Sequence, residues 1–352
     1  MLASGLAGGL LACQLIVGVK DDDGAPRPDA AAPEAGEASA PCVLHKAPEP
    51  PTNGGGMGKG GLVYYALERL VIAPAEDAGA ESVIGYDLDD RCTGLPTARS
   101  DAPCVTPDGG GLVTDEDGGV DNSLRRIFGS LSLLSSDTSD PGAAFFNKAI
   151  RAGTRTVLIA LGDYNGEPDD TEVNVALFAS EGLLPARDGG PVGDGLDEWT
   201  HTGVTQFLPA GPFLPVTGYV TRSVLVTRRA DLVVAFGGFL LTLHDASITA
   251  TIDPSGPGHL VNGTISGRAV ADEVLAAAGQ IPIENNYCLV SSFTGIKSSI
   301  CDHRDLVHPD ASPSETCDSV SVGIGFVAVR AVAKDVIKDA SVEACAPLTC
   351  SP

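Results

Sequence analysis

The sequence predicts a mainly β protein, an antiparallel β-sandwich or jelly roll decorated by three or four short helices. The composition favours this class, because 43 glycines and 25 prolines in 352 residues, with only 5% aromatic residues, are typical of many short elements joined by turns. Residues 219–265 also form short apolar runs separated by turn residues, the pattern of an antiparallel meander. The 43% of hydrophobic residues can fill one large core.

The first strand and three helices are predicted from local signals. Residues 62–72 form a strand because they are rich in branched and aromatic side chains. Asn122 is placed to cap a helix whose apolar residues recur three and four positions apart. A second helix covers residues 143–152 and ends at Gly153, and a third covers residues 270–278.

The remaining strands are runs of apolar and branched residues between turn signals. They are predicted at 156–161, 172–179, 219–227, 247–252, 259–265 and 320–332. A tight hairpin is predicted for residues 232–243, because Gly237-Gly238 tolerates the positive φ angles of a two-residue turn. The dipeptide His244-Asp245 is predicted to turn the chain into the next strand.

The N-terminal region resembles an export signal followed by a tether. Residues 1–12 contain a short apolar stretch that ends at Cys13, as in the lipobox of bacterial lipoproteins, where the cysteine is acylated after cleavage. No Lys or Arg precedes the stretch, so an apolar strand with a core cysteine is the alternative. Residues 13–61 are rich in Pro, Ala, Gly and acidic residues and predict a tether. Residues 62–352 are predicted to form a single domain.

The charge of the chain limits its partners. Acidic residues number 46 against 22 basic ones, a formal net charge of −24, so the surface repels a phosphate backbone and nucleic acid is excluded as a partner. The expected partners are a membrane, reached through the lipid anchor, and a carbohydrate or another component of the envelope. The expected location is the bacterial cell envelope, at the outer membrane or the cell surface.

The cysteine count favours disulfides in an oxidising compartment. Beyond Cys13 there are eight cysteines, enough for four disulfides, and no CxxC motif occurs. The first predicted pair is Cys92 with Cys104, which bracket one short loop. Two weaker pairs are Cys288 with Cys301 and Cys345 with Cys350. A structural metal on Cys301 and His303 is the alternative for that region.

No standard catalytic motif of the HExxH, GxSxG or GxGxxG type occurs. The densest ionisable segment, DHRDLVHPD, contains His303, Asp305, His308 and Asp310 and has residue types that bind a metal or supply a general base. It supports an alternative function, a secreted hydrolase that uses acidic residues with His303 or His308. Trp199 is either a platform for sugar stacking or a core residue.

Two acidic turns have the composition of calcium loops. Hard oxygen ligands alternate along each of them, as calcium requires, although neither has the twelve-residue spacing with a closing glutamate. We expect the ligands of one calcium ion among Asp87, Asp89, Asp115, Asp117, Asp121 and Asn122. The alternative leaves these side chains solvated on separate turns.

Five segments carry a resemblance to known sequences. They are GYDLDDRC at 85–92, DGGVDN at 117–122, DYNGEPDDTEV at 163–173, LVNGTISGR at 260–268 and CDSVSVGIGF at 317–326. With these segments the chain resembles the uncharacterised predicted-lipoprotein families of myxobacteria and related high-GC bacteria. The resemblance implies export and transfers no catalytic residue. The predicted function is that of an exported surface lipoprotein, a non-enzymatic binding or structural module.

Overall fold

The computed structural model describes most of the chain beyond residue 43. The described residues are 44–53, 60–72, 84–93, 103–107, 114–116, 119–130, 140, 142–201, 215–236, 239–279, 282–283, 287–288, 294–310, 312, 315–335 and 349–350. They all belong to one compact unit, Cys42–Pro352. The predicted signal segment, Cys13 and most of the predicted tether lie outside the described residues.

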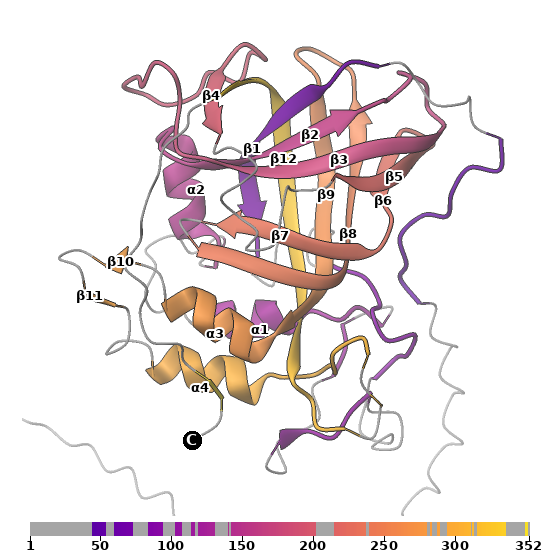
Figure 1. Cartoon of the computed structure of the whole chain (residues 1–352), viewed down its shortest axis with the longest axis vertical. Helices are drawn as coiled ribbons and strands as arrows, with labels where there is room; N and C mark the ends of the chain where they lie inside the picture. Colours follow the sequence, from indigo (N-terminus) through magenta and orange to yellow (C-terminus); the bar gives the residue numbers. More distant parts are fainter. Residues whose placement is uncertain are drawn as a thin grey trace, which may run out of the picture. The chain divides into compact units, whose positions relative to one another are not determined.

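Eight antiparallel strands form a sheet that closes on itself (Figure 1). Their order is β1 (Val63–Val71), β2 (Thr156–Gly162), β3 (Asp170–Ser180), β5 (Val216–Thr221), β6 (Val224–Thr227), β8 (Phe239–Asp253), β9 (His259–Val270) and β12 (Ser319–Asp335). The ring closes because β12 also pairs with β1, where Tyr64 lies opposite Ala331. The mainly β class is confirmed, but a closed barrel replaces the two stacked sheets of the predicted sandwich or jelly roll.

Two further strands extend this sheet. β7 (Ala230–Phe236) pairs with the first half of β8, and its last register pair is Phe236 with Phe239, as the predicted hairpin requires. β4 (Glu198–His201) runs parallel to the end of β12. β4 was not predicted, because its four residues are too few to give a periodic signal.

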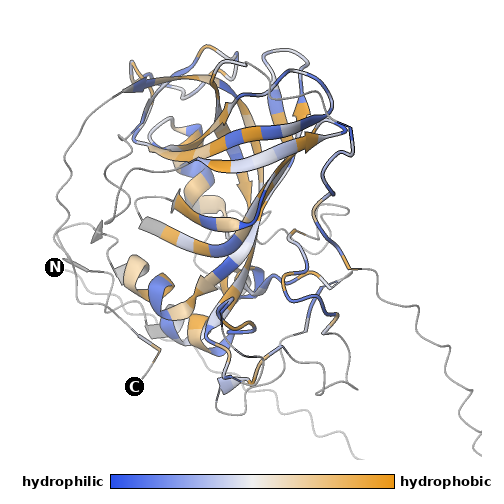
Figure 2. Cartoon of the chain, turned by 45° about the vertical axis from the view of Figure 1, so that its right-hand side comes forward, coloured by the Kyte–Doolittle hydropathy of each residue, from blue (hydrophilic) through white to orange (hydrophobic). Residues whose placement is uncertain are grey.

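The interior of the barrel is filled by alternate residues of its strands. Val157, Ile159 and Leu161 of β2 are buried in the main hydrophobic cluster, and every second residue of β12 from Val322 to Ala328 joins them. Figure 2 shows the resulting alternation of hydrophobic and hydrophilic residues along the strands. Eight strands enclose a space just wide enough for side chains to fill, so this interior is a core. Gly263 is required there, because a Cβ atom would lie 2.4 Å from the ring of Phe326.

Helices cover one end of the closed sheet. α1 (Ser123–Ser130), α3 (Ala271–Gly279) and α4 (Thr294–Asp302) share a second hydrophobic cluster with β12, and Figure 1 shows them together. α2 (Ala144–Arg151) packs against β1. Three of these helices confirm the prediction; α4 and the small sheet of β10 (Pro282–Ile283) and β11 (Tyr287–Cys288) were not predicted. No helix among the described residues is long and apolar enough to cross a membrane.

One turn was not predicted, and one predicted turn lies inside a strand. The predicted strand at 219–227 is a hairpin, β5 and β6, which turns at Arg222 and Ser223 with φ angles of +50° and +64°. Positive φ is uncommon at these residue types, so no sequence signal marked the turn. Conversely, His244 and Asp245 do not end a strand. β8 continues through them with a register shift and a φ angle of +48° at Asp245, which is a bulge.

Residues 44–53, assigned to the tether by their composition, lie against the folded unit. The ring of His45 stacks on Tyr86 at a centroid distance of 5.1 Å, and its Nδ1 lies 3.0 Å from the carbonyl oxygen of Gly85. Tyr219 donates its hydroxyl to the carbonyl of Pro48. These residues belong to the compact unit that starts at Cys42.

Candidate metal centre

Two acidic loops, residues 84–93 and 114–122, lie against the ends of β9 and β12. The backbone N–H of Tyr86 donates to Ser266 Oγ of β9 at 3.3 Å, and the Tyr86 hydroxyl lies 2.8 Å from Thr249 Oγ1 of β8. The loop can approach β12 because residue 323 is glycine. A Cβ atom there would lie 2.2 Å from the carbonyl oxygen of Ile84.

Asn122 joins the two loops to the sheet. Its Oδ1 accepts the N–H groups of Gly323 at 3.1 Å and Arg125 at 3.2 Å, which makes it the predicted N-terminal cap of α1. Its Nδ2 donates to the carbonyl oxygens of Ile84 at 2.8 Å and Gly323 at 3.2 Å. Both polar atoms of the Asn122 amide are therefore hydrogen bonded to protein groups. Asn122, although predicted as a ligand, is not part of the carboxylate cluster.

The turn at Asp87 is built around its own carboxylate. Asp87 is fully buried, and its Oδ1 accepts the N–H groups of Asp89, Asp90 and Arg91 at 2.7–3.3 Å. The Oδ1 atom of Asp89 accepts the N–H of Arg91 at 2.9 Å. The second oxygens, Oδ2 of Asp87 and Oδ2 of Asp89, are buried and accept no hydrogen bond from the described residues. Two carboxylate oxygens are thus left for another kind of partner.

The second loop brings Asp121 to these oxygens. Asp87, Asp89 and Asp121 each offer one carboxylate oxygen, and all three atoms lie within 4.8 Å of one another. Asp121 is only 2% exposed, and its Oδ2 accepts the N–H of Leu88 at 2.7 Å. Asp115 Oδ2 accepts the N–H of Thr93. Asp117, the remaining predicted ligand, lies outside the described residues.

Asp89, Asp115 and Asp121 lie in an environment that disfavours the charge of their carboxylates. Burial raises the pKa of Asp89 to about 6, an effect that Asp87 increases and Arg91 opposes. Burial also raises the pKa values of Asp115 and Asp121, and the charges of Asp89 and Asp305 raise them further. Without a cation, such a cluster keeps protons that solvated carboxylates would lose.

One ammonium group reaches the cluster. Lys46 Nζ lies 3.5 Å from Asp87 Oδ2 and also contacts Asp90. The side chain of Lys46 is 37% exposed, so it approaches from the solvent side. The half-buried guanidinium of Arg268 donates instead to the backbone oxygens of Leu88 and Val307. No sequence signal marks Lys46 as part of this site, because the composition of residues 13–61 predicts a tether.

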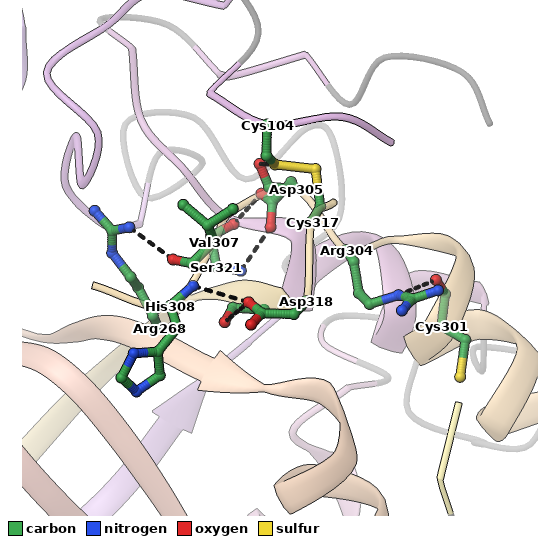
Figure 3. Close-up of a disulfide and its surroundings, with 11 residues drawn as sticks. Cys104, Arg268, Cys301, Arg304, Asp305, Val307, His308, Cys317, Asp318 and Ser321 are labelled. Atoms are coloured by element: carbon green, nitrogen blue, oxygen red, sulfur yellow. Dashed lines mark hydrogen bonds between the residues drawn. A yellow bond between two sulfur atoms is a disulfide. The ribbon is translucent and has the colours of Figure 1, made fainter. Parts of the chain in front are cut away.

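The histidines of the segment 303–310 have separate partners. His303 Nδ1 lies 2.8 Å from the carbonyl oxygen of Ser299, at the end of α4. Asp305 is buried and accepts both the N–H and the hydroxyl of Ser321 (Figure 3). His308 Nδ1 lies 3.9 Å from Asp310, whose side chain is almost fully exposed. In these described contacts neither imidazole is oriented by a buried carboxylate, as the base of a catalytic triad is.

A different histidine, His244 on β8, lies between two carboxylates. Its Nδ1 is 3.2 Å from Asp231 of β7, and its Nε2 is 3.0 Å from Glu273 of α3. The ring of His308 lies 5.0 Å away, and Arg268 is the cross-strand neighbour on β9. Burial alone would lower the pKa of His244, but the hydrogen bonds and charges of Glu273 and Asp231 outweigh it and raise the pKa.

The position of His244 between Asp231 and Glu273 predicts that the free energy of unfolding depends on pH. Because the pKa of His244 is raised in the folded state, its contribution should be complete below about pH 6.5, the pKa of an unfolded histidine, and should be lost as pH rises through the folded value. We expect the difference in unfolding free energy between the wild type and His244→Asn to shrink from pH 5.5 to pH 8.5 in urea titrations. A difference that does not change with pH would contradict this role.

The structure confirms disulfides but not the predicted pairs. Cys104 is bonded to Cys317 across 213 residues, and Cys301 is bonded to Cys350 across 49 (Figure 3 shows the first bond). The predicted pairs Cys92–Cys104, Cys288–Cys301 and Cys345–Cys350 are therefore wrong. Cys92 is disulfide-bonded as well. Cys345 lies outside the described residues, as does the side chain of Cys288. The metal alternative for Cys301 fails because its sulfur is oxidised.

Trp199 is a core residue and not a platform for a sugar. It is 1% exposed and packs with Leu158, Leu183 and Ala331 on the outside of the barrel wall. The segment that carries it, including β4, covers this part of β1, β2 and β12. A ring enclosed in this way has no face open to a ligand.

Comparisons with protein-family models, with curated proteins and with solved structures find no match for this chain. The resemblance to lipoprotein families of myxobacteria therefore stays a prediction. The function must be inferred from the chemistry of the chain's own residues, and the carboxylate cluster of Asp87, Asp89 and Asp121 is the most specific arrangement among the described ones.

Proposed function

We propose that the protein is an exported, lipid-anchored and non-enzymatic binding module whose acidic loops are fixed by one calcium ion. The observation that carries the proposal is the cluster of Asp87, Asp89 and Asp121, whose oxygens lie within 4.8 Å of one another. Two of its buried oxygens accept no hydrogen bond in the described structure. Buried carboxylates need hydrogen bonds, protons or a cation, and these oxygens lack the first.

The chemistry of the cluster fits a hard cation. Its ligands are carboxylate oxygens, which calcium and magnesium prefer. Calcium is favoured because it accepts six to eight oxygens in flexible geometry, whereas magnesium demands a near-ideal octahedron. Carboxylates on two separate loops can satisfy the flexible geometry of calcium more easily than a strict octahedron. Water molecules can complete the coordination of the ion. A divalent ion would also neutralise the cluster better than Lys46, which approaches only Asp87 and the exposed Asp90.

The ion would act on the surface that the loops present. Asp87 and Asp89 belong to the loop at 84–93, and Asp121 belongs to the loop that leads into α1. A cation shared by the three would tie both loops together at the end of β9 and β12. Fixed loops on a closed sheet can display side chains to a partner at a small entropic cost. We propose a carbohydrate or another envelope component as that partner.

The test is thermal melting of metal-free protein in calcium and in chelator. A ligand that binds the folded state alone stabilises it by about 2.7 kcal/mol at a hundred times its Kd, which corresponds to several degrees in Tm. We expect Tm to rise with calcium concentration. An unchanged Tm in wild-type protein shown to be metal-free would remove calcium from the proposal.

Three variants and one matched control make this experiment specific. Asp89→Asn and Asp121→Asn should abolish the calcium response and keep the fold, because asparagine has the shape of a protonated aspartic acid. Asp302→Asn, at an exposed position of α4, is the matched control and should respond as the wild type does. Lys46→Met should enlarge the response, since it removes the ammonium that competes with the ion. A response retained in both cluster variants would place the ion elsewhere.

The proposed anchor is Cys13, in the bacterial cell envelope. Acylation would supply membrane affinity through buried methylene groups, about 0.8 kcal/mol for each. Wild-type protein expressed with its export signal should fractionate with membranes, and Cys13→Ser should not. Identical fractionation of the two forms would contradict the anchor and would leave the calcium experiment unaffected.

A further inference from the structure

The outer face of β2 and β3 contains a hollow made by small residues. Strand pairing places Ala160 opposite Ala176 and Gly162 opposite Asn174. The neighbours of these residues on the strands, such as Ile159 and Leu161, point into the core, so the small residues form the outer face. Where a barrel wall normally carries larger side chains, this part carries a methyl group or none.

The hollow is a pocket of about 370 Å³. This is near the lower end of the range of about 300 to 1,000 Å³ that is usual for small-molecule sites, so it suits a single ring. The residues that line it are Gly60, Leu62, Ala160, Gly162, Asp163, Asn174, Ala176, Phe178 and Pro215. Most of them are apolar or small, and two of them carry planar polar groups.

The polar groups, Asp163 and Asn174, are held together at the edge of the pocket. Asn174 Nδ2 donates to Asp163 Oδ2 at 2.6 Å. The backbone of Asp163 has a φ angle of +61°, a left-handed conformation that aspartate adopts more readily than most other residues with a side chain. Within the described residues, the other oxygens of this pair, Asp163 Oδ1 and Asn174 Oδ1, have no protein partner. They remain free to accept hydrogen bonds from a ligand.

An aromatic ring forms another wall. Phe178 is half-buried and lies next to His201 at a centroid distance of 5.3 Å and next to Tyr64 at 6.2 Å. These contacts restrict the orientation of the Phe178 ring. A ring fixed in advance loses little conformational entropy when a ligand packs against it.

The geometry points to a binding site for one neutral sugar ring in this pocket. A sugar presents C–H groups that pack on Phe178 and on the half-buried Ala176, and hydroxyl groups that donate to the oxygens of Asp163 and Asn174. The Asp163 carboxylate and the net charge of −24 disfavour an anionic ligand. The inference rests on the proposed binding role and names its ligand class, but it uses no residue of the calcium cluster.

The test is saturation-transfer NMR and calorimetry on the full-length protein with neutral monosaccharides. Glucose, galactose, mannose and N-acetylglucosamine are the probes, and cyclohexanol and glucuronate are the apolar and the anionic comparison. We expect at least one neutral sugar to bind with a Kd of about 1 mM or tighter, as a site of this size allows. Neither comparison compound should bind as well.

Variants in the pocket assign the binding to it. Asp163→Ala and Asn174→Ala each remove hydrogen-bond acceptors and should weaken binding about tenfold. Gly162→Ala places a methyl group in the pocket without a clash, because its Cβ would lie 3.5 Å from Leu62 Cδ1 and 3.8 Å from Asn174 Cβ. It should weaken binding and leave Tm unchanged. Asp188→Ala, an exposed aspartate outside the pocket, is the matched control and should bind as the wild type does.

Three outcomes would overturn the inference. They are no binding of any neutral sugar at 50-fold the expected Kd (about 50 mM), preferential binding of cyclohexanol or glucuronate, and sugar binding that survives all three pocket variants. Measurements in calcium and in chelator separate this inference from the proposed function. If Tm depends on calcium but no sugar binds, only the sugar site is rejected. If a sugar binds but Tm does not change with calcium, only the calcium site is rejected.

Discussion

Replacing Cys104 and Cys317 together by alanine is expected to lower the free energy of unfolding by about 2 to 5 kcal/mol. The bond joins residues 213 positions apart, so its loss releases a very long loop in the unfolded chain. Both cysteines are buried, and the double replacement leaves no free thiol to react. Urea unfolding under non-reducing conditions measures the change.

The second disulfide is the matched control for this prediction. Cys301 and Cys350 are separated by 49 residues, so replacing both should cost about 1 kcal/mol less than the loss of the longer loop. A larger loss at the shorter loop would contradict the loop-length explanation. Peptide mapping of unreduced protein should recover these two pairs, and a peptide joining Cys92 to Cys104 would contradict the structure.

The change Asn122→Asp is expected to lower the free energy of unfolding by about 3 to 5 kcal/mol. It removes two donated hydrogen bonds and turns carboxylate oxygen toward the carbonyl oxygens of Ile84 and Gly323. The same change tests the sequence prediction that Asn122 is a calcium ligand. A ligand role predicts tighter calcium binding with an added negative charge, whereas the bridging role predicts an unstable protein.

The control for this prediction is Asn262→Asp. Asn262 is exposed on β9, so the same chemical change there should stay within about 0.5 kcal/mol of the wild type. Urea unfolding of the three proteins in excess calcium and in chelator measures both effects. An Asn122→Asp protein that is as stable as the wild type in chelator would contradict the bridging role.

The strands could be predicted from sequence wherever one face meets the core. Residues 62–72 and 320–332 were predicted as strands and form β1 and β12, because runs of apolar and branched residues fit a buried pleated surface. The pairing of these two strands could not be predicted. They are about 250 residues apart in the sequence (Val63–Val71 and Ser319–Asp335), and the same alternating pattern is found in the strands of a sandwich and of a barrel.

The turns show where local signals fail. Pro254 to Gly258 was predicted as a turn and separates β8 from β9, because proline and glycine set the backbone angles themselves. Arg222-Ser223 has no such preference and is held in its turn by the pairing of β5 with β6. His244-Asp245 was predicted as a turn, yet the pairing of β8 with β7 and β9 carries the strand through it.

The carboxylate cluster was partly predictable. Asp87 and Asp89 belong to one short turn, and Asp121 belongs to a glycine-rich acidic loop, so residue types and spacing identified them. Lys46 joins them from 41 residues before Asp87, and this approach depends on the packing of residues 44–53 on the domain. The pocket on β2 and β3 was missed. Its only sequence signal was the alternation of small residues at 160, 162 and 176, which is common in chains rich in alanine and glycine.

The sequence by itself determined the β class, the cap of α1, the acidic loops and the oxidised cysteines, because each depends on residue type and short-range spacing. The tertiary structure alone decided the closure of β12 onto β1, the partners of the cysteines and the pocket beside Phe178. Cys104 shows the reason. Its partner, Cys317, is 213 residues away, and only the fold brings their Cα atoms to 5.2 Å.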